Sequence, residues 1–230
     1  MKRQRLIIGS ARRGGRTLSG LLLPVCCAAC GQPGAALCPA CRRQAVLPAP
    51  FMRTLSDGLL VRAATRYEGV VRACVLECKR TGSEQLQSVL AELAASCLQL
   101  QLAADCSTEP LTVIPVHSGK QTRGRAGTDL GAALARRAAA ITRRRTRHPV
   151  RVVDLLEVVR RAMSQKSLDR RERQNNVAGS MRARSRRRPN PRRIVLFDDV
   201  VTTGSTLMEA RRALAEAGYV ITAAITIASA

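Results

Sequence analysis

Aromatic side chains are almost missing from this chain of 230 residues, which contains no Trp, two Tyr and two Phe. This scarcity argues against the class of nucleic-acid binder that stacks bases on aromatic side chains. Long apolar runs are missing too: none approaches the roughly 20 residues that a membrane-spanning helix needs, which rules out an integral membrane protein. No repeat or low-complexity period is present either. A globular protein remains, as 46% hydrophobic and 24% charged residues indicate.

Acidic residues are scarce, with 16 Asp and Glu against 39 Lys and Arg, and the net charge is +23. Such a charge attracts anionic partners such as nucleotides, phosphates or nucleic acid. The basic side chains concentrate between Arg136 and Arg193, with 19 Arg and one Lys against four acids. We expect the densest stretches, Arg143–Arg147 and Arg182–Arg193, to be solvated loops or flexible basic arms. No DNA-reading motif accompanies them, so only non-specific attraction to DNA is predicted.

Nine cysteines, an odd number, argue against a disulfide scaffold and favour a reducing cytoplasm. Gly31 and Gly34, which lie between Cys30 and Cys38, suit tight turns. A closed site of four thiolates is typical of structural zinc and leaves no position open for a substrate. Two CxxC motifs separated by seven residues predict such a site, with the ligands Cys27, Cys30, Cys38 and Cys41.

Three alternatives to this interpretation stay open. Cys26 adjoins Cys27 and would serve as the ligand with a CxxxC gap. An isolated CxxC motif can also be a thiol-exchange site. Finally, the apolar stretch Leu18–Ala29 follows a basic segment, as in a signal peptide, but cleavage near Cys30 would destroy the metal site. We therefore expect a cytoplasmic protein.

Apolar periodicity predicts an alternation of strands and helices over most of the chain. Strands are expected over residues 59–67, 111–116, 150–155, 194–197 and 219–228, and helices over 70–79, 84–104, 127–141 and 204–217. This order is typical of an α/β fold with an open, mostly parallel sheet flanked by helices. The expected organisation is a basic extension (1–17), a zinc knuckle (18–50) ending in a Pro-containing linker (46–51), and an α/β domain (51–230).

A run of acidic and hydroxyl side chains follows the expected strand over residues 194–197, which has the clearest apolar pattern. Ligands of parallel sheets bind at the carboxyl ends of such strands. Asp198 and Asp199 are placed to accept hydrogen bonds from vicinal ribose hydroxyls or to help hold a metal through water. A hydroxyl-rich turn into a helix offers backbone N–H groups to a phosphate. The turn consists of Thr202, Thr203, Gly204, Ser205 and Thr206. Simple capping of the helix is the alternative, but it explains one hydroxyl residue rather than four.

Further short motifs accompany this element. Pro24 precedes the paired CxxC motifs, and a Tyr-x-Gly (Tyr67, Gly69) is followed by a Lys-x-x-Gly (Lys79, Gly82). An apolar strand ends in Pro115 and Val116. A Gln-x-x-Leu (Gln165, Leu168) is followed by an Arg-x-x-Asn-Val (Arg173, Asn176, Val177). Val195–Thr206 looks like the phosphoribosyl pyrophosphate (PRPP) signature of type I phosphoribosyltransferases. From about Leu18 onwards the chain resembles the ComF family, the phosphoribosyltransferase-like proteins of natural competence.

The resemblance implies a type I phosphoribosyltransferase-like fold that binds PRPP with Mg²⁺, and phosphoribosyl transfer associated with DNA uptake. It implies that Asp198 and Asp199 hold the ribose and Mg²⁺, and that the turn after them holds the 5′-phosphate. A pyrophosphate loop is expected at His117, Ser118, Gly119 and Lys120, although His117 also fits a surface loop. Single-stranded DNA, competence machinery and a second copy of the chain are the implied partners.

The chain departs from the pattern in two places. In purine-salvage relatives an acid that can act as a base occupies the position of Thr202, which cannot do so. The segment Arg123–Asp129 matches the usual family motif after the Pro-Val strand only loosely, with Arg125 and Asp129 as equivalents. The acceptor therefore stays open, and the alternative function is a non-catalytic PRPP sensor or a DNA-handling competence factor.

Overall fold

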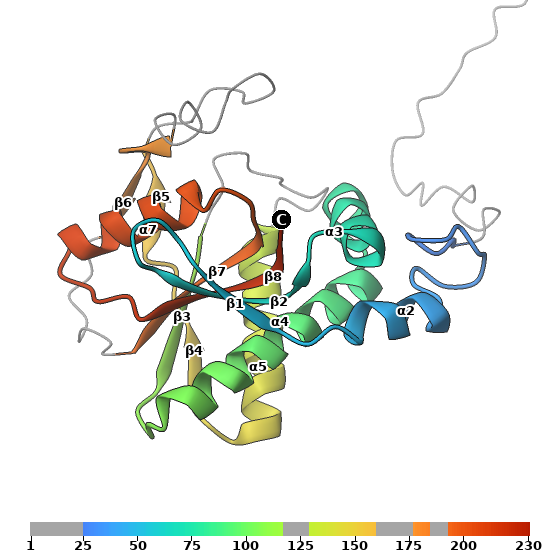
Figure 1. Ribbon diagram of the computed structural model, residues 1–230, viewed down its shortest axis with the longest axis horizontal. Helices are drawn as coiled ribbons and strands as arrows, with labels where there is room; N and C mark the ends of the chain where they lie inside the picture. Colours follow the sequence, from blue (N-terminus) through green and yellow to red (C-terminus); the bar gives the residue numbers. More distant parts are fainter. Residues whose placement is uncertain (1–24, 117–128, 160–176, 185–192) are drawn as a thin grey trace, which may run out of the picture.

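The computed structural model describes residues 25–116, 129–159, 177–184 and 193–230, and over these it forms an α/β sheet with helices on both faces (Figure 1). The helices are α2 (Pro39–Val46), α3 (Gly69–Thr81), α4 (Glu84–Asp105), α5 (Leu130–Thr146) and α7 (Ser205–Glu216). The strands are β1 (Phe51–Thr54), β2 (Leu60–Arg66), β3 (Leu111–Pro115), β4 (Val150–Val152), β5 (Leu156–Val158), β6 (Met181–Ala183), β7 (Ile194–Val201) and β8 (Ala223–Ser229).

Six strands form the main sheet in the order β1-β2-β8-β7-β3-β4. Strand β1 is antiparallel to β2, and all other neighbouring pairs are parallel. The central strands are apolar along their length because helices cover both faces. The expected α/β fold with a mostly parallel sheet is confirmed, and each of the strands and helices expected from periodicity is present among the described residues.

Alternation along β7 sends its side chains into two separate apolar clusters. Phe197 packs on the side of α3, α4 and α5, together with Ile225 of β8. Leu196 packs on the other side with α7 and Leu207. Figure 1 shows α7 and α3 on opposite sides of the β7 and β8 ends. This alternation decides which helix the next two residues of β7 meet.

Three short strands are absent from the sequence prediction. Strand β1 has four residues, and β5 and β6 have three each, which is too short for a period of two to stand out. Strands β5 and β6 pair with each other in a small antiparallel sheet beside α7. The linker expected over residues 46–51 is shorter than that, because α2 includes Val46 and β1 begins at Phe51.

The described arginines of the basic stretches are mostly exposed, as expected, but they belong to a helix and a strand rather than to loops. Helix α5 continues to Thr146, so Arg143, Arg144 and Arg145 form its last turn, where cations favour the helix dipole. Arg143 also donates to the carbonyl oxygen of Val150 at 2.7 Å. Residues 185–192 of the second stretch lie outside the described residues, but Arg182 belongs to β6.

Arg193 shows the clearest departure, since its side chain is only 9% exposed. It forms an ion pair with Asp105 at 2.7 Å and donates to the carbonyl oxygen of Glu109 at 2.6 Å. These contacts hold the start of β7 against the end of α4. Arg193 is therefore a structural residue rather than part of a basic arm. Within the described residues every helix is too short or too polar to cross a bilayer.

Candidate functional site

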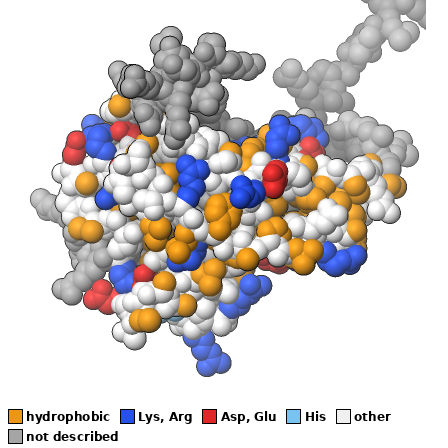
Figure 2. Space-filling view, in the orientation of Figure 1, with side chains coloured by type: hydrophobic (Ala, Val, Ile, Leu, Met, Phe, Trp, Pro, Cys, Tyr) orange, Lys and Arg blue, Asp and Glu red, His pale blue; other side chains and the backbone are white. Residues whose placement is uncertain are grey.

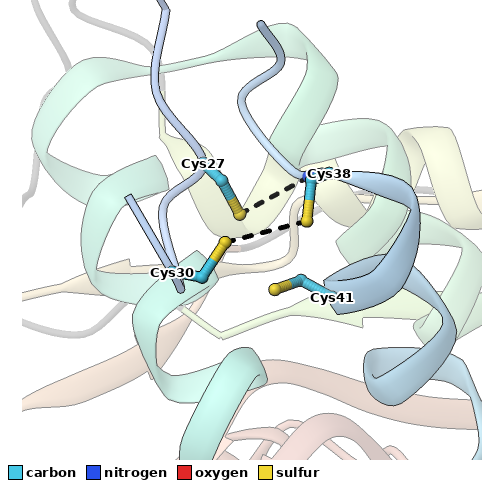
Figure 3. A group of neighbouring side chains, drawn as sticks. All are labelled: Cys27, Cys30, Cys38 and Cys41. Atoms are coloured by element: carbon cyan, nitrogen blue, oxygen red, sulfur yellow. Dashed lines mark hydrogen bonds between the residues drawn. The ribbon is translucent and has the colours of Figure 1, made fainter. Parts of the chain in front are cut away.

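Four cysteines converge near the start of the described chain. The sulfur atoms of Cys27, Cys30, Cys38 and Cys41 all lie within 4.8 Å of one another (Figure 3). Cys30 is exposed, whereas the other three are buried. Cys26, the alternative ligand, is exposed, pairs with Pro33 in an isolated β-bridge and lies outside the cluster. The cluster therefore contains Cys27 rather than Cys26, and the ligand assignment stays a prediction.

Local backbone geometry brings the two CxxC motifs together. Gly31 and Gly34 adopt positive φ angles of 75° and 117°, which other residues adopt only with strain. The Gly31 N–H donates to the carbonyl oxygen of Cys27 at 2.9 Å and closes the first turn. The second motif begins at the N-terminus of α2, where the Cys38 N–H points at the Cys27 sulfur from 3.4 Å (Figure 3). Both motifs thus aim their sulfurs at one point.

Charge at the cluster favours a bound cation. Burial opposes ionisation of Cys27, but backbone N–H groups, that of Cys38 above all, lower its pKa to about 6. In contrast, the hydrogen bond with Cys38, with burial, raises the pKa of Cys41 to about 12. One thiolate thus forms easily, while four together require a cation to neutralise them. Four sulfur donors in a closed arrangement fit a structural zinc ion.

A second polar group lies at the carboxyl end of β7. Asp199 forms an ion pair with Lys79 in the last turn of α3, with 2.6 Å between Oδ2 and Nζ. Asp198 accepts a hydrogen bond on Oδ1 from the Asp199 N–H at 2.8 Å. The adjacent register position on β8 is Thr226, a buried residue whose hydroxyl has no hydrogen-bond partner among the described residues. The pair therefore faces a polar, incompletely satisfied environment.

The two carboxyl groups differ in charge. Burial, followed by repulsion from Asp199, raises the pKa of Asp198 to about 8. Burial also works against the ammonium of Lys79, but attraction to Asp199 and Asp198 outweighs it and raises the pKa of Lys79. Around neutral pH one proton and one lysine neutralise the acid pair. Magnesium at this pair stays a prediction.

The turn between β7 and α7 is shaped by Gly204. Its φ angle is +82°, and a Cβ atom added there would lie 2.6 Å from Cδ1 of Leu55. Next to it, the hydroxyl oxygens of Thr203 and Ser205 are 2.8 Å apart. Gly204 is also the N-cap of α7 and has no side chain that could cap the helix, but the Thr203 hydroxyl accepts from the Ser205 N–H at 3.4 Å. Capping therefore accounts for one hydroxyl, that of Thr203, and the other N–H groups of the first turn of α7 are suited to an anion.

The β1–β2 hairpin makes hydrogen bonds with the turn between β7 and α7, and these contacts were not predicted from the sequence. Arg53 of β1 donates to the carbonyl oxygen of Thr202 at 3.1 Å and to the hydroxyl of Ser229 at 3.0 Å. In the hairpin loop, Asp57 accepts from Arg211 of α7 at 3.1 Å. Residues 51–54 (Phe-Met-Arg-Thr) show no alternation of apolar and polar side chains, and four residues are too few to distinguish a strand from a linker.

A cavity of about 340 Å³ lies next to the turn and is lined by Ser56, Ala178, Ser205, Met208, Glu209 and Arg212. Glu209 is buried and accepts a hydrogen bond from the Met181 N–H at 2.9 Å. Arg212 completes the pairing of Glu209, at 2.8 Å. Glu209 and Arg212 therefore fasten α7 to β6, and they hold the helix that carries the turn.

Residues 117–128 lie outside the described residues, and the predicted pyrophosphate loop at His117, Ser118, Gly119 and Lys120 falls there. The described residue before them, Val116, donates its N–H to the carbonyl oxygen of Phe197 at 2.8 Å. Asp129, which was expected to match a motif residue after the Pro-Val strand, is the N-cap of α5 and accepts from the Ala132 N–H.

Comparison with known proteins supplies no identity, because neither the family models nor the curated proteins that were compared match this chain.

Proposed function

We propose that this protein is a phosphoribosyltransferase-like protein of the ComF family that binds PRPP at the carboxyl end of β7 and transfers its phosphoribosyl group. The observation that carries the proposal is the order of groups along one continuous segment. Two carboxyl groups, Asp198 and Asp199, lie near the carboxyl end of β7, and the N-terminus of α7 follows within a few residues. PRPP carries vicinal hydroxyls and a 5′-phosphate with a matching order.

The division of labour follows from charge. The N-terminus of α7, with Thr203, Ser205 and Thr206 around Gly204, would hold the 5′-phosphate through N–H groups and hydroxyls. Asp199, which forms an ion pair with Lys79, would accept from a ribose hydroxyl, whereas the raised pKa of Asp198 lets it donate as well as accept. The ribose is thus fixed from two sides while its C1 bond breaks.

Catalysis at such a site consists of positioning and electrostatic stabilisation of the departing pyrophosphate and the positive charge at C1. The exposed residue Thr202 supplies no base, so the acceptor must arrive as a competent nucleophile. Magnesium would enter as the counter-ion of the pyrophosphate and hence as part of the substrate.

The cysteine cluster supports a separate, structural role within this proposal. Its closed set of sulfurs leaves no position for a substrate. Ala36 and Ala45, which flank the second CxxC motif, join the same apolar cluster as α3 and α4. The knuckle would therefore stabilise the face of the domain that carries α3.

The DNA-handling alternative has weaker support. Figure 2 shows the Lys and Arg side chains of the visible face in separate groups, without one continuous field. Several arginines in the basic region make internal contacts, among them Arg143, Arg182, Arg184 and Arg193. Single-stranded DNA, competence partners, a homodimer and a cytoplasmic location stay predictions from the sequence.

Isothermal titration of PRPP with Mg²⁺ into zinc-loaded protein tests the proposal, followed by a pyrophosphate-release assay with candidate bases. We expect binding that disappears in the double variant Asp198→Asn/Asp199→Asn. The matched control is Glu77→Gln/Glu84→Gln, which removes two carboxylates from α3 and α4 outside the site and should leave the affinity unchanged. Unchanged affinity in the aspartate variant would refute the site, and binding without pyrophosphate release would reduce the protein to a sensor.

A further inference from the structure

Lys79 occupies a distinctive place among the basic residues of this arginine-rich chain. It is one of only four lysines among 39 Lys and Arg residues. Among the described residues it is also the one basic side chain that forms an ion pair with the acid pair of β7, at 2.6 Å from Asp199. Its side chain is 31% exposed.

The attachment of Lys79 fixes where its charge lies. Helix α3 ends directly after it, at Gly82, whose φ angle of +70° and N–H bond to the Cys78 carbonyl oxygen close the helix. The helix is anchored by Val71, Cys74 and Val75, which are buried in the core. Lys79 is therefore held at the carboxyl end of the sheet by a rigid element.

The acid pair lies between Lys79 and the turn of α7. Asp199 meets α3 on one face of the sheet, while α7 packs on the opposite face (Figure 1). A ligand with its phosphate at the α7 turn and its sugar at Asp198 and Asp199 extends its far end toward α3. The far end of a ribose 5-phosphate group is C1, which carries the pyrophosphate in PRPP.

An ammonium at that position suits the pyrophosphate for two reasons. It has three N–H donors, and Asp199 uses one of them. A compact point charge on a flexible stem can also turn from a carboxylate to a phosphate without moving its helix. We infer that Lys79 binds the pyrophosphate of PRPP, holding Asp199 in the free protein and the leaving group in the complex; this inference rests on the proposed function.

The test compares two ligands in one buffer with Mg²⁺: PRPP and ribose 5-phosphate, which lacks the pyrophosphate. Affinities are measured by titration calorimetry for the wild type and for Lys79→Gln. We expect the variant to lose about ten- to a hundredfold in PRPP affinity, as for a charged hydrogen bond, and less than about threefold in ribose 5-phosphate affinity. Retained ribose 5-phosphate binding also shows that the variant is folded.

Two further variants sharpen the result. Lys79→Arg keeps the charge and should recover part of the PRPP affinity. Arg80→Gln removes the same charge one residue away, where Arg80 pairs with Glu77 on the exposed side of α3, and should change neither affinity.

The outcomes separate the two claims. Equal losses for both ligands in Lys79→Gln would mean that Lys79 only positions Asp199, which overturns the inference and leaves the proposed function intact. Unchanged PRPP affinity would overturn the inference in the same way. Failure of the wild type to bind either ligand would overturn the proposed function and the inference with it.

Discussion

The cysteine cluster and the acid pair of β7 are built in opposite ways. The cluster comes from one short segment: Cys27 and Cys38 are only 11 positions apart, and the turns at Gly31 and Gly34 bring them together. The acid pair instead depends on side chains from distant segments. Lys79 comes from α3, and Arg53, 149 positions from Thr202, supports the turn that follows. A local site tolerates changes elsewhere in the fold, whereas an assembled site depends on each element that contributes to it.

The largest expected effect breaks the local site. Cys27→Ser should abolish binding of one zinc ion per chain and destabilise the protein by several kcal/mol, because metal binding is coupled to folding of such a module. Zinc content after dialysis and urea unfolding measure this. Cys26→Ser changes the adjacent, exposed cysteine outside the cluster and should keep the zinc. Zinc loss in Cys26→Ser but not in Cys27→Ser would reverse the ligand assignment.

An intermediate effect is expected at the assembled site. Gly204→Ala forces a residue to φ +82° and places its Cβ 2.6 Å from Leu55, so we expect a loss of about 2–4 kcal/mol and of PRPP binding. Gly218→Ala isolates the backbone contribution, because Gly218 has the same φ with nothing within 4 Å of the added Cβ. It should cost about 1 kcal/mol and leave binding intact. Urea unfolding compares the two variants, and equal losses would show that Leu55 does not shape the turn.

The smallest expected effect concerns the charge of the acid pair. Because the folded-state pKa of Asp198 is raised to about 8, above that of the unfolded chain, the folded protein binds more protons between about pH 4 and pH 8. The stability of the wild type therefore falls as the pH rises through this range. Asp198→Asn removes the titration and should stabilise the free protein, increasingly as the pH rises toward 8.

The pH profile is the measurement that decides this prediction. The stability gain of Asp198→Asn in urea unfolding should grow from pH 5 to pH 8 and level off above that. Glu84→Gln, at a side chain that is 85% exposed, is the control and should show no such trend. A gain that shrinks with rising pH would mean that Asp198 is ionised and stabilising in the free protein.

Sequence reasoning was most successful where the pattern was long or dense. Periodicity predicted the central strands and the long helices because burial on both faces of a parallel sheet requires continuous apolar runs. It failed at β1, which has four residues, and at Arg193, whose burial depends on Asp105 and backbone carbonyls of another segment. A dense run of arginines predicts exposure to solvent. The composition of the run does not show which of its arginines form ion pairs and become buried.

The cysteine cluster, the α/β class and the order of acids, glycine and hydroxyls from β7 into α7 could be predicted from the sequence alone. These properties depend on neighbours along the chain: CxxC spacing, apolar runs and a glycine at positive φ. Only the tertiary structure decided that Lys79 meets Asp199, that Leu55 and Arg53 support the turn, and that Arg193 is buried. Those contacts depend on strand order and on which face each helix covers, and a parallel sheet joins residues that are remote in the chain.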